Sequence, residues 1–168
     1  MRHATMLVSA FLIAACGPHA NETQEATHAQ PATASESVAD ALPTVSIYEA
    51  AVANASRPEA DRGRDAGRKP AEVLEFLGIG NGMTVLDMFS GGGYYAEILA
   101  SVVGDGGKVI AQSNEAYLQF VGEEFHTRYA NDRLPNVDIL MAENNEFDVA
   151  ADSLDAVMLV LSYHDLVL

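Results

Sequence analysis

The chain has 168 residues, 49% of them apolar, which is enough for one modest domain with a buried core. Its formal net charge of −15 argues against a nucleic-acid backbone as the main partner, because like charges repel. Cys16 is the one cysteine, so an intrachain disulfide is excluded.

The first residues have the features of an export signal. Arg2 supplies a short positive region, and residues 6–15 form an apolar stretch too short to span a bilayer as a helix. The sequence Ile-Ala-Ala before Cys16 resembles the lipobox of bacterial lipoproteins, in which the cysteine carries the lipid after cleavage. The alternative is an ordinary secretory signal in which the cysteine is coincidental.

The resemblance to a lipobox implies a location. Gly17, in place of an aspartate, suggests in such proteins sorting to the outer membrane. We therefore expect a signal peptide over residues 1–15 and a protein held in the bacterial cell envelope, facing the periplasm. The lipid would attach it to a membrane surface without a spanning helix.

Residues 16–46 are predicted to be the lipid anchor and a disordered linker. They are rich in Ala, Thr, Ser, Glu, Gln and Pro and have few large apolar residues, so burial cannot offset the entropy cost of ordering them. His19 and His28 lie here and are expected to be solvated, and we predict no metal site. The folded domain is expected to cover residues 47–168.

The domain is expected to begin with helices over residues 47–53, 57–69 and from Pro70 onward. The second of these has acid–base spacings typical of a solvated, self-paired helix: Arg57–Asp61, Asp61–Arg64 and Asp65–Lys69. The alternative is that one of its arginines reaches over a following glycine turn to a ligand carboxylate or phosphate. The third is expected to bury Val73, Leu74 and Leu77.

The central feature is a strand, a glycine turn and a helix between residues 84 and 103. Residues 84–88 form a short apolar run with Asp87 near its end, which is typical of a buried parallel strand. Glycines follow at residues 91–93, and an apolar helix face then recurs at Tyr95, Ile98, Leu99 and Val102. This order opens nucleotide-binding α/β folds, where glycines admit a ligand close to the backbone.

These residues resemble the first motif of class I S-adenosylmethionine-dependent methyltransferases. Asp87 matches the acid at the strand end, and Gly91 and Gly93 match the second and third glycines of the family pattern. Phe89 stands where the family usually has its first glycine. The resemblance implies S-adenosylmethionine as cofactor, bound by Asp87, Phe89, Ser90, Gly91 and Gly93.

A second template fits the same turn. Gly91, Gly93 and Ala96 also satisfy the dinucleotide fingerprint, which is a weak signal when it stands alone. A glycine turn that binds nothing is a further alternative, because fold does not imply function.

The remaining elements alternate between strands and helices. Strands are predicted over residues 108–112, 137–141 and 154–161, and one helix begins after Asn114, with an exposed pair Glu124–Arg128. The buried face of this helix is expected to consist of Tyr117, Phe120, Val121 and Phe125. The fold class is therefore α/β: a Rossmann-like parallel sheet with flanking helices.

Polar residues follow the later strands, where the family resemblance implies further cofactor contacts. Ser113 and Asn114 stand where the family has an acid for the ribose hydroxyls, and Glu143 with Asn144 stands near the expected adenine. Asn114 as a mere helix cap is equally open. Because carboxyl ends of parallel strands share one edge, we expect these residues to meet Asp87.

The segment after the fourth strand holds the candidate catalytic residues. His164 is a candidate general base and Tyr163 a ring that packs on the cofactor. A structural histidine that caps the strand end is equally open, and adjacent side chains such as His164 and Asp165 seldom converge into a catalytic pair.

Three functions remain open from the sequence. The family sheet has seven strands and this chain holds the first four, so we expect an incomplete methyltransferase domain: the N-terminal, cofactor-binding half of an enzyme that methylates an unknown small-molecule acceptor. A NAD(P)-dependent oxidoreductase is less compatible with Asp87 and Glu143. An exported, non-catalytic binding protein on the same scaffold would suit Phe89, the missing ribose acid and the envelope location.

Overall fold

The computed structural model describes residues 44–166, and the predicted signal peptide, Cys16 and almost all of the linker lie outside them. The helices are α1 (Ile47–Val52), α2 (Glu59–Arg68), α3 (Pro70–Leu77), α4 (Tyr94–Val103), α5 (Glu115–Val121) and α6 (Glu123–Tyr129). The strands are β1 (Thr84–Met88), β2 (Lys108–Ser113), β3 (Val137–Met141) and β4 (Ala156–Leu159), with short 3-10 helices η1 (Ala130–Asp132) and η2 (Tyr163–Leu166).

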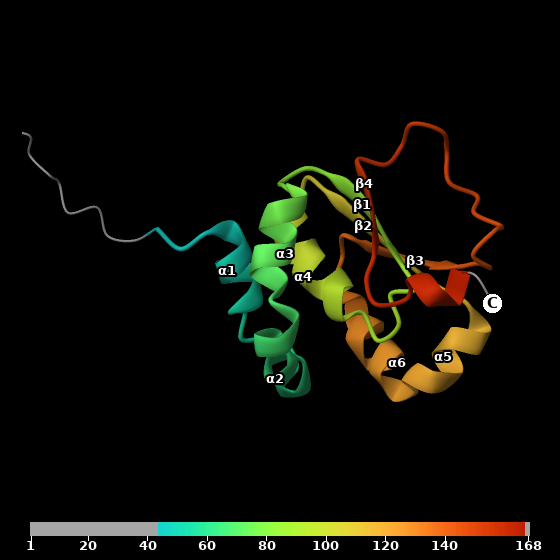
Figure 1. Ribbon diagram of the computed structural model, residues 1–168, viewed down its shortest axis with the longest axis horizontal. Coiled ribbons are helices and arrows are strands. Elements are labelled where there is room, and N and C mark those ends of the chain that lie inside the picture. The colour runs from blue at the N-terminus through green and yellow to red at the C-terminus, as the bar shows by residue number, and fades with distance from the viewer. Residues whose placement is uncertain (1–43, 167–168) are drawn as a thin grey trace, which may run out of the picture. The chain divides into compact units, whose positions relative to one another are not determined.

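The four strands form one parallel sheet in the order β3-β2-β1-β4 (Figure 1). The predicted Rossmann-like fold class is confirmed. The strand order runs outward from β1 to β2 and β3 and then reverses to β4, so the carboxyl end of β1 is a topological switch point. β4 is shorter than predicted, and Leu161, with φ of 61°, leaves the extended conformation.

The core lies between this sheet and α4. Val85, Val109 and Met158 meet Ile98 and Leu99 of the helix in one cluster of buried side chains. The prediction of a single apolar face on α4 was too narrow, because nearly every residue of the helix is buried. Helix α1 contacts both α3 and α4 (Figure 1), and α1 and α3 cover part of the surface that would otherwise face solvent.

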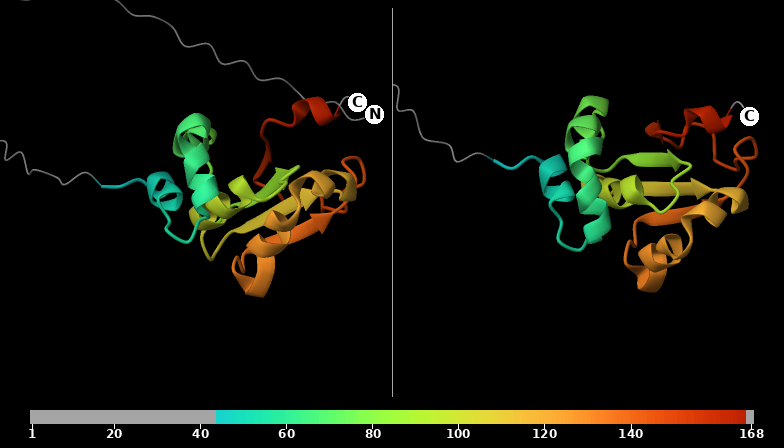
Figure 2. Two further views of the ribbon diagram at one scale, coloured as in Figure 1. Left: turned by 90° about the horizontal axis from the view of Figure 1, so that it is seen from below. Right: turned by 60° about the horizontal axis from the view of Figure 1, so that its bottom comes forward.

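The helix predicted after β2 is interrupted. Gly122, with φ of 64°, separates α5 from α6, which lie together on the β3 side of the sheet in both views of Figure 2. Phe125 is buried as predicted, but Phe120 is 90% exposed. Leu77 of α3 is exposed too, against its predicted place in a buried face.

Helix α2 is attached by charges. Its one buried residue is Asp61, so it contributes no apolar side chain to the core. Asp61 accepts hydrogen bonds from Arg64 within the helix and from Arg128 of α6, the latter at 2.6 Å. Of the predicted pairs only Asp61–Arg64 is correct: Arg57 binds Asp65 instead, and Lys69 binds Glu72.

Arg128 is the centre of a buried ionic cluster, not half of an exposed pair with Glu124. Its guanidinium binds Asp61 of α2, Glu97 of α4 and the backbone oxygen of Gly92. Arg133 adds two further bonds to Glu97, at 2.6 and 2.7 Å. Both carboxylates are 2% exposed, so the cluster joins three helices through charges withdrawn from water.

Two features are absent from residues 44–166. No helix there is long and apolar enough to cross a membrane. Within the same residues, no three His, Cys, Asp or Glu side chains are grouped in a way that could hold a metal ion.

Arg128→Met is expected to destabilise the chain by about 3–5 kcal/mol, because it leaves buried carboxylates short of a partner. The matched control is Lys108→Met, which breaks an exposed pair with Asp138 and should cost about 0–1 kcal/mol. Urea unfolding of both variants measures the difference. Equal losses would show that the cluster contributes no more than a surface pair.

Candidate functional site

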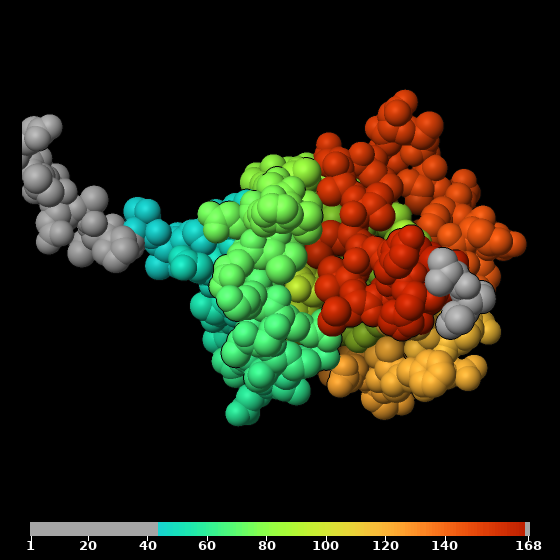
Figure 3. Space-filling view, in the orientation of Figure 1, coloured from blue at the N-terminus to red at the C-terminus, as the bar shows by residue number. Residues whose placement is uncertain are grey.

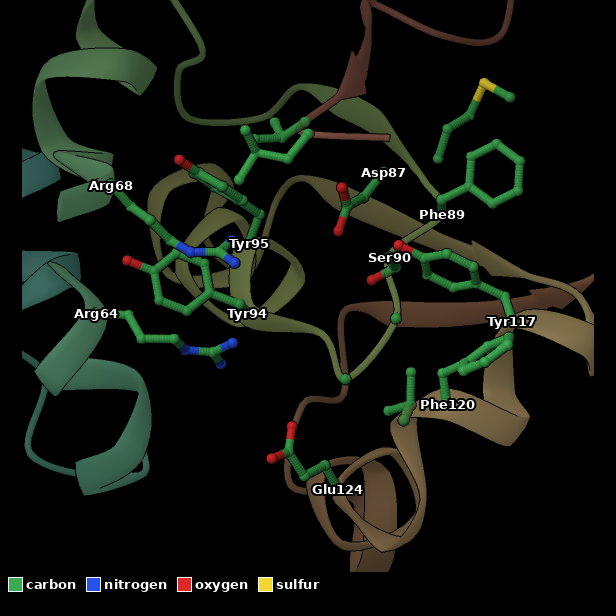
Figure 4. Close-up of a pocket in the computed structure, with 16 residues that line it drawn as sticks. Arg64, Arg68, Asp87, Phe89, Ser90, Tyr94, Tyr95, Tyr117, Phe120 and Glu124 are labelled. Atoms are coloured by element: carbon green, nitrogen blue, oxygen red, sulfur yellow. The ribbon is translucent and has the colours of Figure 1, made fainter. Parts of the chain in front are cut away.

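A cavity of about 460 Å³ opens at the carboxyl end of β1 (Figure 4). Its floor is the segment from Asp87 to Gly92, and the residues after β4 add Val160 and Leu161. The other lining side chains come from four helices: Arg64 and Arg68 of α2, Tyr94 and Tyr95 of α4, Tyr117, Phe120 and Val121 of α5, and Glu124 of α6. The cavity therefore lies at the switch point, where open α/β sheets bind ligands.

Asp87 is the buried acid of the floor. It is 4% exposed, and burial raises the pKa of its carboxyl to about 7. Within the described residues, the Oδ2 atom of Asp87 has no hydrogen-bond partner of good geometry, although the nearby Ser90 hydroxyl opposes part of the rise in the pKa. Unpaired buried polar atoms are costly, so their presence at a cavity floor indicates a place where a ligand completes the bonding.

The turn after Asp87 has three residues with positive φ: Phe89 at 50°, Gly91 at 58° and Gly93 at 79°. The left-handed region strains any residue with a Cβ by about 1–2 kcal/mol. This strain explains why glycine is usual at the position that Phe89 occupies here. Phe89 offsets this strain by burying its ring, which packs against that of Tyr117 with centroids 5.3 Å apart.

The end of β2 holds the turn in place. Gln112 accepts a hydrogen bond from the Phe89 N–H at 2.9 Å and donates one to the Ala142 oxygen at 2.7 Å. Ser113 is fully buried, and its hydroxyl accepts from the Gly91 N–H at 3.3 Å. In the structure the Ser113 side chain supports the glycine turn, and its predicted contact with a ribose stays a prediction.

The two predicted glycines have different surroundings. A Cβ at Gly91 would lie 3.3 Å from the Tyr117 ring, within the cavity. A Cβ at Gly93 would lie 2.5 Å from Arg128 Cδ and also too close to the Tyr129 hydroxyl. Gly93 is therefore required by the ionic cluster behind the turn, and Gly91 is the glycine at the ligand side.

The polar residues after β2 and β3 meet one another outside the cavity lining. Asn114 caps α5 by accepting from the Tyr117 N–H, and its amide donates to Glu143 at 3.1 Å. Glu143 is exposed, and neither it nor Asn144 lines the cavity with Asp87. The predicted convergence on Asp87 therefore does not include this pair, and their contact with a cofactor stays a prediction.

Tyr163 and His164 lie on the outer surface. Tyr163 is 71% exposed, and the side chain of His164 is 73% exposed. Figure 3 shows the red carboxyl-terminal segment, which holds them, on the face of the molecule turned to the viewer. Neither lines the cavity. His164 Nε2 lies 3.2 Å from Asp165 Oδ1, a closer approach than expected for adjacent residues, and the catalytic role stays a prediction.

Sequence reasoning missed several lining residues. Tyr94, Tyr117 and Phe120 were unassigned or expected in the core, yet they line the cavity with Glu124. Arg64 and Arg68 line it as well, which agrees with the less favoured expectation that an arginine of residues 57–69 reaches toward the glycine turn. The clustering of basic residues just before the glycine motif was the available signal.

The parallel sheet, the switch point and the glycine turn after a buried acid are the arrangement of class I S-adenosylmethionine-dependent methyltransferases. The family model described as protein-L-isoaspartate(D-aspartate) O-methyltransferase matches residues 32–146, more than half of the chain. The chain belongs to this family, whose match covers β1 to β3 and ends before β4.

Two solved structures resemble parts of the chain. A SAM-dependent methyltransferase from Aquifex aeolicus is 31% identical over 56% of this chain and 49% of its own, with a TM-score of 0.48. A protein-L-isoaspartate O-methyltransferase is 26% identical over 44% of this chain and 22% of its own, with a TM-score of 0.37. The chain thus spans about half the length of the first of these structures. No curated protein sequence matches it.

Asp87→Asn is expected to change how stability depends on pH. An unfolded aspartate has a pKa of about 3.9, whereas burial raises the folded pKa to about 7. Between these values the unfolded state releases a proton that the folded state keeps, so wild-type stability falls as pH rises from about 4 to about 7. Asparagine cannot ionise and removes this loss.

Urea unfolding at pH 4, 6 and 8 measures this effect. The free energy of unfolding of Asp87→Asn, relative to that of wild type, should rise by up to about 4 kcal/mol between pH 4 and pH 8, at about 1.4 kcal/mol per pKa unit. Asp138→Asn, an exposed acid, is the control. A difference between Asp87→Asn and wild type that does not change with pH would contradict the raised pKa.

Proposed function

We propose that this chain binds S-adenosylmethionine at the carboxyl end of β1, as the cofactor-binding half of a methyltransferase. The observation that supports this most is the buried Asp87 carboxyl, whose Oδ2 atom has no hydrogen-bond partner within the described residues, beside a glycine turn at the floor of the cavity. Family membership points to the same cofactor. The cofactor, when bound, supplies an electrophilic methyl group on a sulfonium.

The residues of the floor fit such a ligand. The Asp87 carboxylate and the Ser90 hydroxyl can accept hydrogen bonds from an ammonium. The positive charge of the ammonium would favour the ionised form of Asp87. Gly91 leaves room for a ligand beside the Tyr117 ring. The rings of Phe89 and Tyr117 give the cavity an apolar side against which a nucleoside can pack.

For the methyl acceptor, we propose a carboxylate, following the family description of an aspartate or isoaspartate O-methyltransferase. A carboxylate is already ionised at neutral pH, so it needs no general base, and catalysis is mainly the in-line positioning of two reactants. This mechanism makes no demand on His164, whose exposed position suits it poorly for proton removal at the cavity floor.

Two other functions remain as alternatives. A NAD(P)-dependent oxidoreductase receives no support from the family match. A non-catalytic binding protein would use the same cavity, and Phe89 in place of a glycine is the feature that favours it.

Gly91→Val is expected to abolish binding of S-adenosylhomocysteine, the product of methyl transfer. A branched side chain at φ of 58° is strained, and its Cβ would press on the Tyr117 ring. Calorimetric titration of wild type and variant measures this, with NADH as the competing ligand. Gly106→Val, at an exposed glycine with open space around it, is the control and should bind as wild type does.

Wild-type binding of NADH but not of S-adenosylhomocysteine would reject the proposal in favour of an oxidoreductase. Unchanged S-adenosylhomocysteine binding by Gly91→Val would place the ligand away from the turn.

We also propose that Cys16 is lipidated and holds the protein at the bacterial outer membrane, facing the periplasm. The support is the sequence alone: an apolar stretch and small residues before the one cysteine, followed by Gly17. Metabolic labelling with palmitate should mark wild type and not Cys16→Ala, which should also leave the membrane fraction or remain unprocessed. Equal labelling of both would refute the anchor.

A further inference from the structure

One wall of the cavity is basic although the chain as a whole is strongly acidic. Arg64 and Arg68 lie one helical turn apart on α2, and Figure 4 shows both guanidinium groups extending from the helix toward the Tyr94 ring. Both line the same cavity as Asp87. The cavity therefore has a carboxylate on its floor and cations on one wall.

The two arginines differ in how their charge is satisfied. Arg64 binds Asp61, so its charge already has a partner. Arg68 makes no ion pair with any carboxylate between residues 44 and 166. It is half-buried, and its charge acts on the neighbouring Tyr95, where burial raises the pKa of the phenol and Arg68 opposes that rise. Arg68 is thus a cation in the cavity wall that lacks an anion.

The side chain of Arg68 rests on a fixed platform. Its guanidinium lies 4.6 Å from the centre of the Tyr94 ring. The Tyr94 hydroxyl donates to Asp65 at 2.6 Å, and Asp65 accepts two bonds from Arg57, at 2.8 and 2.9 Å. The Tyr94 ring offers no acceptor that ties up all the N–H groups of Arg68, and no ion pair within residues 44–166 engages them, so they remain available for a planar anion.

We propose that Arg68 is a carboxylate anchor for the ligand of this cavity. This inference rests on the proposed function, since the cofactor would bring a sulfonium and an ammonium beside an existing guanidinium. A carboxylate between these charges removes their repulsion. The carboxylate belongs either to the amino-acid end of the cofactor, whose ammonium would then face Asp87, or to the methyl acceptor.

The test compares Arg68→Met with wild type in three calorimetric titrations of the full chain. The first ligand is S-adenosylhomocysteine, and the second is S-adenosyl-3-thiopropylamine, which lacks only the carboxylate. The third is a short isoaspartyl peptide, added to the chain already loaded with S-adenosylhomocysteine. Arg62→Met, at an exposed arginine of α2 outside the cavity lining, is the matched control.

We expect Arg68→Met to weaken one carboxylate ligand roughly ten- to hundredfold and Arg62→Met to weaken none. If Arg68→Met loses affinity for S-adenosylhomocysteine but not for S-adenosyl-3-thiopropylamine, the anchored carboxylate belongs to the cofactor. Loss for the peptide, with both nucleosides unchanged, assigns it to the acceptor. Arg68→Lys, which keeps the charge without the planar fork, should retain part of the affinity in either case.

Two results would overturn the anchor while leaving the proposed function intact. One is that Arg68→Met and Arg62→Met have the same affinity for every ligand that the wild-type chain binds. The other is that both nucleosides weaken equally, which would mean that Arg68 shapes the cavity without contacting a carboxylate. A wild-type chain that binds none of the three ligands would overturn both the anchor and the proposed function.

Discussion

The guanidinium of Arg128 is the contact on which the site depends. It binds the Gly92 oxygen in the turn, Glu97 in α4 and Asp61 in α2, so one side chain fixes the floor and one wall of the cavity together. It occupies the space that the missing side chain of Gly93 leaves free. The glycine motif therefore has two physical roles, one toward the ligand and one toward the cluster that supports the turn.

The sheet and its turn could be predicted because local signals determine them. The apolar run of β1, the glycines after Asp87 and the helical spacing of α4 lie within twenty residues and require no distant partner to be recognised. The alternation of strands and helices then restricts the topology to a parallel sheet. The position of Asp87 at the floor of the cavity follows from this topology, and sequence alone was sufficient to predict it.

The walls of the site could not be predicted, because they depend on contacts between distant segments. Arg128 has an acid four residues before it, yet it binds Asp61, which is 67 positions away. Spacing along a helix cannot reveal that a more buried partner exists elsewhere. The prediction for Phe120 was wrong for the same reason, because the break at Gly122 decides which way its side chain faces. The contact of Ser113 with the Gly91 N–H likewise depends on the approach of the turn to β2.

The floor of the cavity and its α2 wall are stabilised by different interactions. The floor belongs to an apolar core, whose stabilisation weakens on cooling, whereas α2 is attached through ion pairs and buries only Asp61. Charged pairs lose part of their desolvation penalty as temperature rises, and their exposed members are screened by salt. Cooling is therefore expected to weaken the apolar support of the floor more than the ionic attachment of the basic wall, while Arg128 keeps the two joined.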